Sequence, residues 1–565
     1  MEEKLKHYLA NILTELGVAD TAVLLEHPAE FRHGDWATNV AMAGAKKAGK
    51  NPRQLAEEIV VKLKAINDPD IAAIEIAGPG FINFTLSKDH FVQELDRALK
   101  SGEGFGANDT LKGKKVIVEY TDPNPFKEFH IGHLMANTIG EAIARIVEAS
   151  GAETKRACYQ GDVGMHVAAA VWGMEREALP KADSSVIERA AYLGRAYARG
   201  ASSAKFDDVV RHEITLLNKK IYDRTDEEVN RLYDTGKAWS LAYFEEIYKK
   251  LGTKFDHYFF ESQTGMYGKE LVLTHVGEIF EKSDGAVVYK GDESKGLHTR
   301  VFVNKEGLPT YEAKELGLAK IKYDTYPYDI SIIITGNEVN DYFRVLLDAM
   351  SKVFPPLAAK TEHYSHGMLR LPTGKMSSRT GDVITAESLI EDTKTKALAK
   401  IAGSEFSDTE KNEITAYVAV GAIKYSILRQ ASGKDIIFDV EQSLSFEGDS
   451  GPYLQYTHAR TQSLLAKAGD KNIDASVMPD RETPSLHKHI LRFPEVVLRA
   501  QAEREPHYIA TYLIELAREF NGFYGNTIVL DGAPDEPYKL ALVQMTSRIL
   551  KRGLSLLGIP APTTM

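Results

Sequence analysis

The fold of this chain is decided by Lys115-Val116-Ile117-Val118-Glu119-Tyr120-Thr121-Asp122-Pro123-Asn124-Pro125, which leads into Phe129-His130-Ile131-Gly132-His133. Residues 115–120 are rich in β-branched side chains and predict a buried strand, and the prolines that follow disfavour a helix. From about Gly132, apolar residues recur at three- and four-residue steps up to Gly151, which predicts a helix. A strand, a tight turn and a helix in this order indicate an α/β fold with a parallel sheet.

Two histidines stand at the predicted start of that helix. A helix N-terminus offers free backbone N–H groups and a partial positive charge, so phosphate is favoured there. His130 and His133 can converge on one phosphate, and Gly132 between them has no side chain to block a flat base. Two alternatives stay open: the histidines are ordinary polar residues at a helix cap, or they bind zinc, although no third ligand is specified nearby.

A second polar stretch, Leu371-Pro372-Thr373-Gly374-Lys375-Met376-Ser377-Ser378-Arg379, lies far downstream. It has no hydrophobic period, which predicts a surface loop. Lys375 is a cation and Ser377 and Ser378 are hydroxyl donors, so the loop can close on a polyphosphate and neutralise developing charge. Alone it fits any exposed turn; together with the histidine pair it indicates a nucleotide-binding site.

Length and composition narrow the class of protein. A chain of 565 residues predicts several domains, and 43% hydrophobic with 26% charged residues is typical of a globular protein. The single cysteine, Cys158, rules out a disulfide within the chain and fits a cytoplasmic protein; we expect it to be buried in a strand. We expect no membrane span, and no signal peptide in the N-terminal residues. A net charge of −11 argues against a general polyanion binder but allows a specific RNA partner.

Residues 1–108 predict a separate α/β domain that opens with an amphipathic helix ending at Gly17. Phe81 and Asn83 follow a glycine turn and project from one face of a predicted strand. An aromatic ring beside an amide suits an unpaired base. A strand packed in the ordinary way explains the spacing equally well.

Residues 112–385 predict the catalytic domain, in which the stretch from about 167 to 290 departs from strand–helix alternation and suggests an insertion. Downstream, Tyr311 and Glu315 are four apart and share a helix face, where a carboxylate beside a phenol can bind a cation. An ordinary surface pair is the alternative.

Residues 386–565 predict a mostly helical domain. Tyr456 and Arg460 share a helix face, and an aromatic ring with a guanidinium can stack on bases and bind phosphate. The alternative is an ordinary pair on a bundle surface. Aromatic residues around Tyr524 fit either RNA contact or the bundle core.

The two motifs in this order resemble the HIGH and KMSKS signatures of class I aminoacyl-tRNA synthetases. Over nearly its whole length the chain is similar to arginyl-tRNA synthetases, including Glu119 to His133, the turn Gly161-Asp162-Val163-Gly164 and the terminal Met565. The resemblance implies a multidomain α/β plus all-α fold. Its parts would be an N-terminal domain that reads the tRNA D-loop, a Rossmann-type catalytic domain with insertions, and a C-terminal helical bundle that binds the anticodon.

The resemblance also implies an arginine–tRNA ligase that uses ATP with Mg²⁺, holds no tightly bound metal, and binds L-arginine and tRNA(Arg). We expect a monomer. The implied catalytic residues are His130, His133, Lys375 and Lys127. The implied ATP-binding residues are His130, Gly132, His133, Lys375, Met376, Ser377 and Ser378. The implied arginine-binding residues are Glu119, Asn124, His130, Tyr311, Glu315 and Glu338. The implied tRNA-binding residues are Phe81, Asn83, Tyr456, Arg460, Tyr524 and Met565.

Three positions depart from the family pattern. Glu315 stands where the family usually has Asp, Val339 where it often has Gln, and Ser378 where a second lysine often stands. The family pattern therefore does not fix the details of arginine recognition in this chain, although negative charge is retained.

Two rival functions remain. The first is a class I synthetase for another amino acid, although the carboxylates Glu119, Glu315 and Glu338 favour a cationic substrate. The second is a non-catalytic RNA-binding or scaffold protein, against which intact His130, His133 and Lys375 argue.

Overall fold

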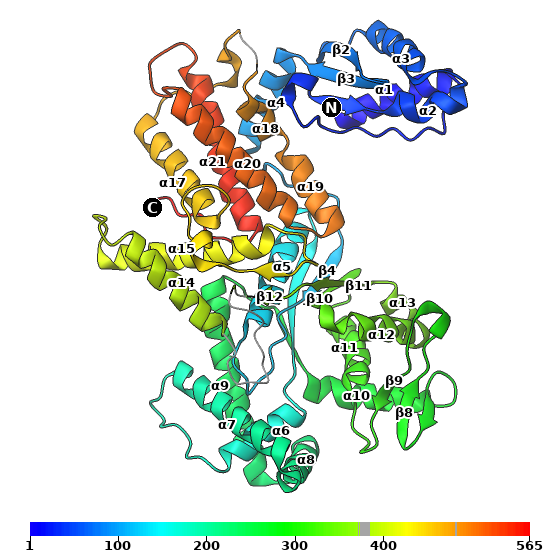
Figure 1. The fold of residues 1–565 in the computed structure, drawn as a ribbon, viewed down its shortest axis with the longest axis vertical. Coiled ribbons are helices and arrows are strands. Elements are labelled where there is room, and N and C mark those ends of the chain that lie inside the picture. Colours follow the sequence, from blue (N-terminus) through cyan, green and yellow to red (C-terminus); the bar gives the residue numbers. More distant parts are fainter. Residues whose placement is uncertain (371, 373–384, 481–482) are drawn as a thin grey trace. The chain divides into compact units, whose positions relative to one another are not determined.

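A computed structural model describes the chain of 565 residues apart from 371, 373–384 and 481–482 (Figure 1). The backbone forms two compact units, which are described one at a time. Unit 1 comprises Met1–Phe105, Arg460–Pro494 and Glu515–Ile549, and unit 2 comprises Gly106–Ala459, Glu495–Ile514 and Leu550–Met565. The predicted loop residues Lys375, Met376, Ser377 and Ser378 lie outside the described residues.

Unit 2 is built around a parallel sheet of five strands in the order β11-β10-β4-β5-β6. Helices flank the sheet, and its central strands β4 and β10 are mostly buried; in β4 only the first residue is exposed. The strands are β4 (Lys115–Glu119), β5 (Glu153–Gln160), β6 (His257–Phe260), β10 (Ile330–Gly336) and β11 (Thr361–His366).

The strand order reverses at β4. The chain adds β5 and then β6 on one side of β4, and later crosses to place β10 and β11 on the other side. Ile333 of β10 is paired with Glu119, the last residue of β4. Open parallel sheets bind ligands at the carboxyl ends of the strands where the order reverses. This arrangement confirms the predicted Rossmann-type sheet and places the end of β4 at its switch point.

The helices and small sheets between these strands belong to the same unit. Helix α5 (Ile131–Ala149) connects β4 to β5, as predicted, and Cys158 is buried in β5. The strand β6 lies inside the stretch 167–290, so that stretch contributes to the sheet as well as departing from it. The remaining elements up to β11 are α6 (Met165–Met174), α7 (Val186–Phe206), α8 (Asp208–Asp223), α9 (Glu227–Leu251), α10 (Glu261–Thr274), the antiparallel strands β7 (Glu281–Ser283), β8 (Ala286–Tyr289) and β9 (Arg300–Val303), α11 (Tyr311–Thr325), α12 (Asn340–Val353) and α13 (Pro355–Ala358).

Beyond β11 the chain is mostly helical, as the sequence predicts. The two-residue strands β12 (Leu369–Arg370) and β13 (Ile436–Ile437) pair with each other. The helices are α14 (Ala386–Lys400), α15 (Asp408–Leu428), α16 (Val440–Ser443), α17 (Gly451–Ala468), α18 (Ser485–Leu491), α19 (Phe493–Glu503), α20 (His507–Asn526) and α21 (Glu536–Leu556). Helices α17, α19, α20 and α21 have residues in both units.

Unit 1 contains the predicted N-terminal α/β domain. Its antiparallel sheet has the order β1-β3-β2, and the side chains of β3 alternate between half-exposed and buried. Lys488 of α18 pairs with Asp35 at 2.8 Å, with both side chains nearly buried, which fastens α18 to the N-terminal residues within this unit. Its first elements are α1 (Glu2–Glu15), β1 (Trp36–Thr38), α2 (Val40–Ala48), α3 (Pro52–Ile66), β2 (Ile71–Ala77), β3 (Phe81–Leu86) and α4 (Lys88–Ser101).

Candidate active site

The two predicted histidines form a cap at the start of α5. The His130 Nδ1 accepts a hydrogen bond from the Gly132 N–H at 3.1 Å, and the His133 Nδ1 accepts one from the His130 N–H at 3.3 Å. The two rings are stacked, with centroids 3.6 Å apart. Both side chains thus satisfy backbone donors that the first helical turn leaves without partners.

These contacts determine what the imidazoles offer to a ligand. Burial and the charge of Lys127 lower the pKa of His130 to about 4, and burial lowers that of His133 well below its usual value, so both rings are neutral at pH 7. Because each Nδ1 accepts a hydrogen bond, each neutral ring carries its proton on Nε2. The pair therefore presents two neighbouring N–H donors, which suit phosphate oxygens.

Gly132 also has a local structural role, beside the one that the sequence predicts. A Cβ built at this position lies 2.9 Å from Cε1 and 3.0 Å from Nδ1 of His130. The closest group is thus the capping histidine itself. Any larger side chain would push the His130 ring from its place at the helix start.

The chain returns to this cap directly after the undescribed residues 373–384. Thr385 forms an antiparallel bridge with His130, and the Ala386 N–H donates to the Phe129 carbonyl at 2.8 Å. Thr385, which follows the KMSKS-like segment in the sequence, therefore lies beside His130.

The turn between β4 and α5 is strained. Thr121, Asp122 and Phe126 have φ angles of 81°, 44° and 69°, in the left-handed region that residues with side chains rarely occupy. Thr121 is held by Asn137, whose amide donates to its Oγ1 at 3.0 Å. Strain of this kind persists where surrounding contacts fix the backbone, and it often marks a functional site.

Acidic side chains gather at the end of β4. The Glu119 carboxylate accepts a hydrogen bond from the Lys322 ammonium of α11 at 2.6 Å, and both side chains are about 2% exposed. Burial, and then the charge of Glu119, raise the pKa values of Glu315 and Asp122 well above the usual range. Glu119, Asp122 and Glu315 therefore share one desolvated pocket in which negative charge accumulates.

A second ion pair borders this pocket. Glu261, the first residue of α10, pairs with Lys314 of α11 at 2.5 Å, and both are buried. A Cβ built on Gly161 lies 2.5 Å from the Asn124 Oδ1 and 3.4 Å from a Glu261 oxygen. The glycine of the Gly161-Asp162-Val163-Gly164 turn thus lets the Asn124 amide approach the acidic cluster.

The comparisons with known proteins agree with this geometry. The family profile described as tRNA synthetases class I (R), catalytic domain, matches residues 94–440, and the profiles for the arginyl tRNA synthetase N terminal domain and the DALR anticodon binding domain match residues 2–86 and 454–565. The chain belongs to the arginyl-tRNA synthetases.

Individual relatives span the whole chain. The arginine–tRNA ligase of Bacteroides thetaiotaomicron is 30% identical over 94% of this chain and 93% of its own length. That of Fusobacterium nucleatum is 33% identical over 93% and 92%. The solved structure of the Thermus thermophilus arginyl-tRNA synthetase is 26% identical, with both chains fully covered and a TM-score of 0.80.

A cavity of about 600 Å³ in this synthetase is lined by two of the predicted residues, Lys127 and Tyr311. The Lys127 ammonium lies 4.7 Å from the centre of the Tyr197 ring, and its charge acts on His130, His133 and His166. A cation thus lies close to the histidine pair. Tyr311 begins α11 and is 61% exposed, so its phenol is accessible from solvent.

Other predicted residues are placed as follows. Glu338 is exposed in a short 3₁₀ turn (Asn337–Val339) directly after β10. Phe81 and Asn83 lie on the half-exposed face of β3, as the alternation predicts. Within unit 1, the Arg460 guanidinium lies 5.2 Å from the centre of the Tyr524 ring and hydrogen-bonds Asn521.

The last two predicted tRNA contacts lie in unit 2. Tyr456 is 37% exposed on α17. Met565 packs, half-buried, against a cluster of apolar side chains that includes Ile414 and Val418 of α15. Their roles toward RNA stay predictions.

Four residues at the acidic site were not predicted from the sequence: Lys322, Lys314, Glu261 and Asp162. Lys322 and the Lys314–Glu261 pair look like ordinary charges on helical segments, and nothing in the local pattern indicates that they are buried. Asp162 is fully buried and accepts hydrogen bonds from Tyr233, Lys237 and Ser262 at 2.7 to 2.8 Å. Its position in the glycine-rich turn 161–164 is the one feature of the sequence that points to a role for Asp162 near the site.

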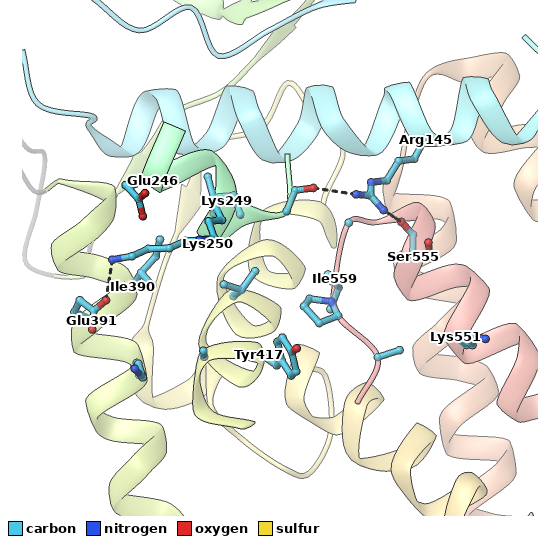
Figure 2. A pocket seen from close by; sticks show the side chains of 18 residues that line it. Arg145, Glu246, Lys249, Lys250, Ile390, Glu391, Tyr417, Lys551, Ser555 and Ile559 are labelled. Atoms are coloured by element: carbon cyan, nitrogen blue, oxygen red, sulfur yellow. Dashed lines mark hydrogen bonds and ion pairs between the residues drawn. The ribbon is translucent and has the colours of Figure 1, made fainter. Parts of the chain in front are cut away.

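A larger cavity, of about 710 Å³, lies elsewhere in unit 2 (Figure 2). Figure 2 shows the Lys250 ammonium reaching Glu391 of α14, at 3.1 Å, and Arg145 directed toward the Ser555 carbonyl, at 3.1 Å. None of the predicted site residues that the structure describes lines this cavity. The predicted site residues that the structure describes therefore lie away from this cavity.

Two features are absent from the described part of the chain. It holds no group of three or more His, Cys, Asp or Glu side chains placed to bind a metal ion. No helix in it has both the length and the apolar composition needed to cross a bilayer.

Proposed function

We propose that this synthetase activates L-arginine with ATP and transfers the arginyl group to the 3′ end of tRNA(Arg). One observation carries the proposal: a pair of neutral histidine N–H donors and a cluster of carboxylates both lie near the carboxyl end of β4, at the switch point of the sheet. The first suits a nucleotide phosphate and the second a cationic side chain.

The reaction has two steps. An oxygen of the arginine carboxylate attacks the α-phosphorus of ATP, and the bond to the β-phosphate oxygen breaks, giving arginyl-adenylate and pyrophosphate. The terminal ribose hydroxyl of tRNA then attacks the arginyl carbonyl, and AMP leaves. Phosphoryl transfer of this kind depends on positioning and charge neutralisation.

The histidine cap and nearby cations handle the phosphates. The Nε2–H groups of His130 and His133 bind α-phosphate oxygens and hold them as charge shifts to pyrophosphate. Lys127 adds positive charge on the same side. Lys375, with Met376, Ser377 and Ser378, closes on the pyrophosphate; this assignment comes from the sequence, and its support is that Thr385, ten residues on, pairs with His130. Magnesium accompanies ATP as part of the substrate, and no tightly bound metal is needed.

The acidic pocket takes the arginine. A guanidinium has only donors, in a planar fork, and carboxylates that accept it bidentately discriminate against lysine by shape. Glu119 and Glu315 receive the guanidinium, Tyr311 covers it, and Asn124 with His130 approach the α-carboxylate or ribose. Glu338 adds negative charge at the rim.

The tRNA is bound by the remaining predicted residues. Phe81 and Asn83 contact the D-loop from the N-terminal domain, residues 1–108. Tyr456, Arg460, Tyr524 and Met565 contact the anticodon loop from the helical domain, residues 386–565. The exposed faces of β3 and α17 support these roles. The enzyme acts as a monomer in the cytoplasm, with the catalytic domain at residues 112–385.

The test is tRNA charging with arginine, lysine, glutamate and cysteine under identical conditions. Charging with arginine alone is expected. Preferential charging with any of the other three would overturn the assignment, and sedimentation at the assay concentration would test the monomer.

A further inference from the structure

Lys322 is a buried cation that the two-step reaction does not use. It lies near the end of α11 and is 2% exposed, and its ammonium is 2.6 Å from the Oε2 of Glu119. The other oxygen of Glu119, Oε1, accepts no hydrogen bond from the part of the chain that the structure describes. One oxygen of this carboxylate is therefore engaged and the other is left for a ligand.

The pair cannot be explained by stability alone. A buried ion pair is often no more stabilising than apolar side chains of the same volume, because both charges must leave water. The neighbours of Lys322 on α11, Leu318 and Ala319, are apolar and fully or almost fully buried. An apolar residue would fit this setting, so the effect of Lys322 lies in its charge.

The charged groups around Glu315 come from several elements. Glu119 and Asp122 face it from the end of β4 and the following turn, and Glu261 from α10. On its own helix, Lys322 lies seven residues, or about two turns, further along the same face. The negative charge of Glu315 also contributes to the raised pKa values of Tyr159 on β5 and Tyr342 on α12, after burial as the main cause.

Two lysines balance only part of this negative charge. Lys314 pairs with Glu261 and Lys322 with Glu119, which leaves Asp122 and Glu315 without a lysine of their own among the described residues. Lys322 acts on both carboxylates at the end of β4, since it contacts Glu119 and also favours the ionised form of Glu315.

We propose that Lys322 is a specificity-determining positioning residue of the arginine pocket: its ammonium holds the Glu119 carboxylate in place through Oε2, so that Oε1 and the Glu315 carboxylate together accept one guanidinium. The inference rests on the proposed function, because it names what sets the pocket's preference for arginine.

Removing the lysine charge changes the chemistry of the acceptors. Two buried carboxyl groups that repel each other retain a shared proton. The protonated group then donates a hydrogen bond, and the guanidinium has no acceptor to receive it. Citrulline, the neutral analogue of arginine, carries a ureido carbonyl that can accept this hydrogen bond. Loss of Lys322 therefore weakens arginine binding and shifts the preference toward citrulline.

The experiment compares wild type with Lys322→Met and Lys322→Arg in tRNA charging. In Lys322→Met we expect the KM for arginine to rise about 10- to 100-fold, since a hydrogen bond to a charged group contributes about 1.5–3 kcal/mol. The KM for ATP and the kcat at saturating arginine stay within about three-fold of wild type, as expected for an interaction made equally in the ground and transition states. Lys322→Arg keeps the charge and restores arginine use.

Two further readouts separate charge from structure. The acid limb of kcat/KM for arginine moves to higher pH in Lys322→Met, because the lysine no longer favours ionised Glu315. The ratio of the citrulline inhibition constant to the arginine KM falls about ten-fold or more, by the same hydrogen-bond argument. If folded Lys322→Met shows the wild-type acid limb of kcat/KM and the wild-type citrulline-to-arginine ratio, and only its thermal midpoint is lower, then Lys322 has a structural role. That result would overturn the proposal.

A double variant guards against misfolding. Glu119→Gln combined with Lys322→Met removes both charges, and neutral pairs of this kind are generally tolerated. The neutral amide introduced by Glu119→Gln does not repel the Glu315 carboxylate. The acid limb of kcat/KM for arginine is therefore expected at or below its wild-type pH in the double variant. An acid limb at higher pH contradicts the proposal. Failure of wild type itself to charge arginine would instead overturn the proposed function, so the two failures are distinguishable.

Discussion

Two buried lysines in unit 2 show how the partner of a charge decides what that charge does. Lys322 contacts a carboxylate at 2.6 Å, and although burial opposes ionisation, Glu119 raises the pKa of the lysine above its usual value. Lys424, on α15, donates instead to the carbonyls of Leu251 and Gly558 at 2.7 and 2.8 Å. Burial lowers its pKa to about 7.

The difference separates a pocket that recognises a ligand from a junction that holds chain segments together. Around Lys322, excess carboxylates remain for a cationic substrate. Around Lys424, the ammonium links α15 to Leu251 at the end of α9 and to Gly558 after α21, and these two partner residues are among those that line the cavity in Figure 2. Variants of the first region should therefore act mainly on catalysis, and variants of the second mainly on stability.

The largest catalytic effect is expected for His133→Ala, at the phosphate side of the catalytic region. Losing one preorganised donor to the transition state should lower the charging rate by about 10²–10³-fold. The affinity for tRNA, measured by filter binding, should stay unchanged. The exposed His298→Ala variant is the matched control. Wild-type charging by His133→Ala would remove this residue from the mechanism.

Glu315→Gln should have the next largest effect. Without the charged acceptor, kcat/KM for arginine should fall by about 10- to 100-fold, since the lost hydrogen bond involved a charged group. Steady-state kinetics should show the KM for ATP and the thermal midpoint close to wild type, and the exposed Glu306→Gln variant provides the control. An equal rise in both KM values would mean that Glu315 acts on the whole fold.

Lys424→Met should affect stability and its pH dependence. The folded pKa of about 7 lies below the unfolded value of 10.5, so between these values the unfolded chain binds more protons than the native protein. The wild-type thermal midpoint should therefore rise as pH increases from 7 toward 10, and the penalty is largest below pH 7. In Lys424→Met this slope should be smaller, with kcat nearly unchanged. Lys434→Met, at an exposed lysine, is the control. If the thermal midpoint depends on pH equally in Lys424→Met and in this control, Lys424 does not lose its proton in the folded protein and the prediction fails.

The smallest effect is expected for Tyr456→Ala, outside both regions. Loss of one stacking surface should raise the KM for tRNA several-fold, since stacking on an aromatic ring contributes about 1–3 kcal/mol per base. The KM for ATP should not change in the same assay. Equal losses for both substrates would argue against an anticodon contact.

Much of the fold was predictable because its signals are local. The β-branched run 115–120 and the helical period after Gly132 specify β4 and α5, and the position of the histidines at the helix start follows from them. Those patterns depend only on neighbours along the chain. The stacked histidine pair at the helix start could be anticipated for the same reason, and its role toward phosphate stays a prediction.

The arginine side could be predicted only in part. Glu119 and Glu315 were identified from the family resemblance, but Lys322 contacts Glu119 across 203 residues of sequence, and its burial depends on how α11 packs on the sheet. A lysine on an amphipathic helix normally extends into water. The structural role of Gly132 could not be predicted either, because it depends on the His130 ring folding back over the first turn of α5, next to Gly132. The role of Lys375 stays a prediction.

The central claim is that the buried carboxylates at the end of β4 select a guanidinium. It is tested most directly by ATP–pyrophosphate exchange in the presence of tRNA(Arg), with arginine, lysine and citrulline compared at equal concentrations. The account predicts exchange that depends strongly on arginine, with lysine and citrulline near background. Exchange with lysine or citrulline equal to that with arginine would contradict it.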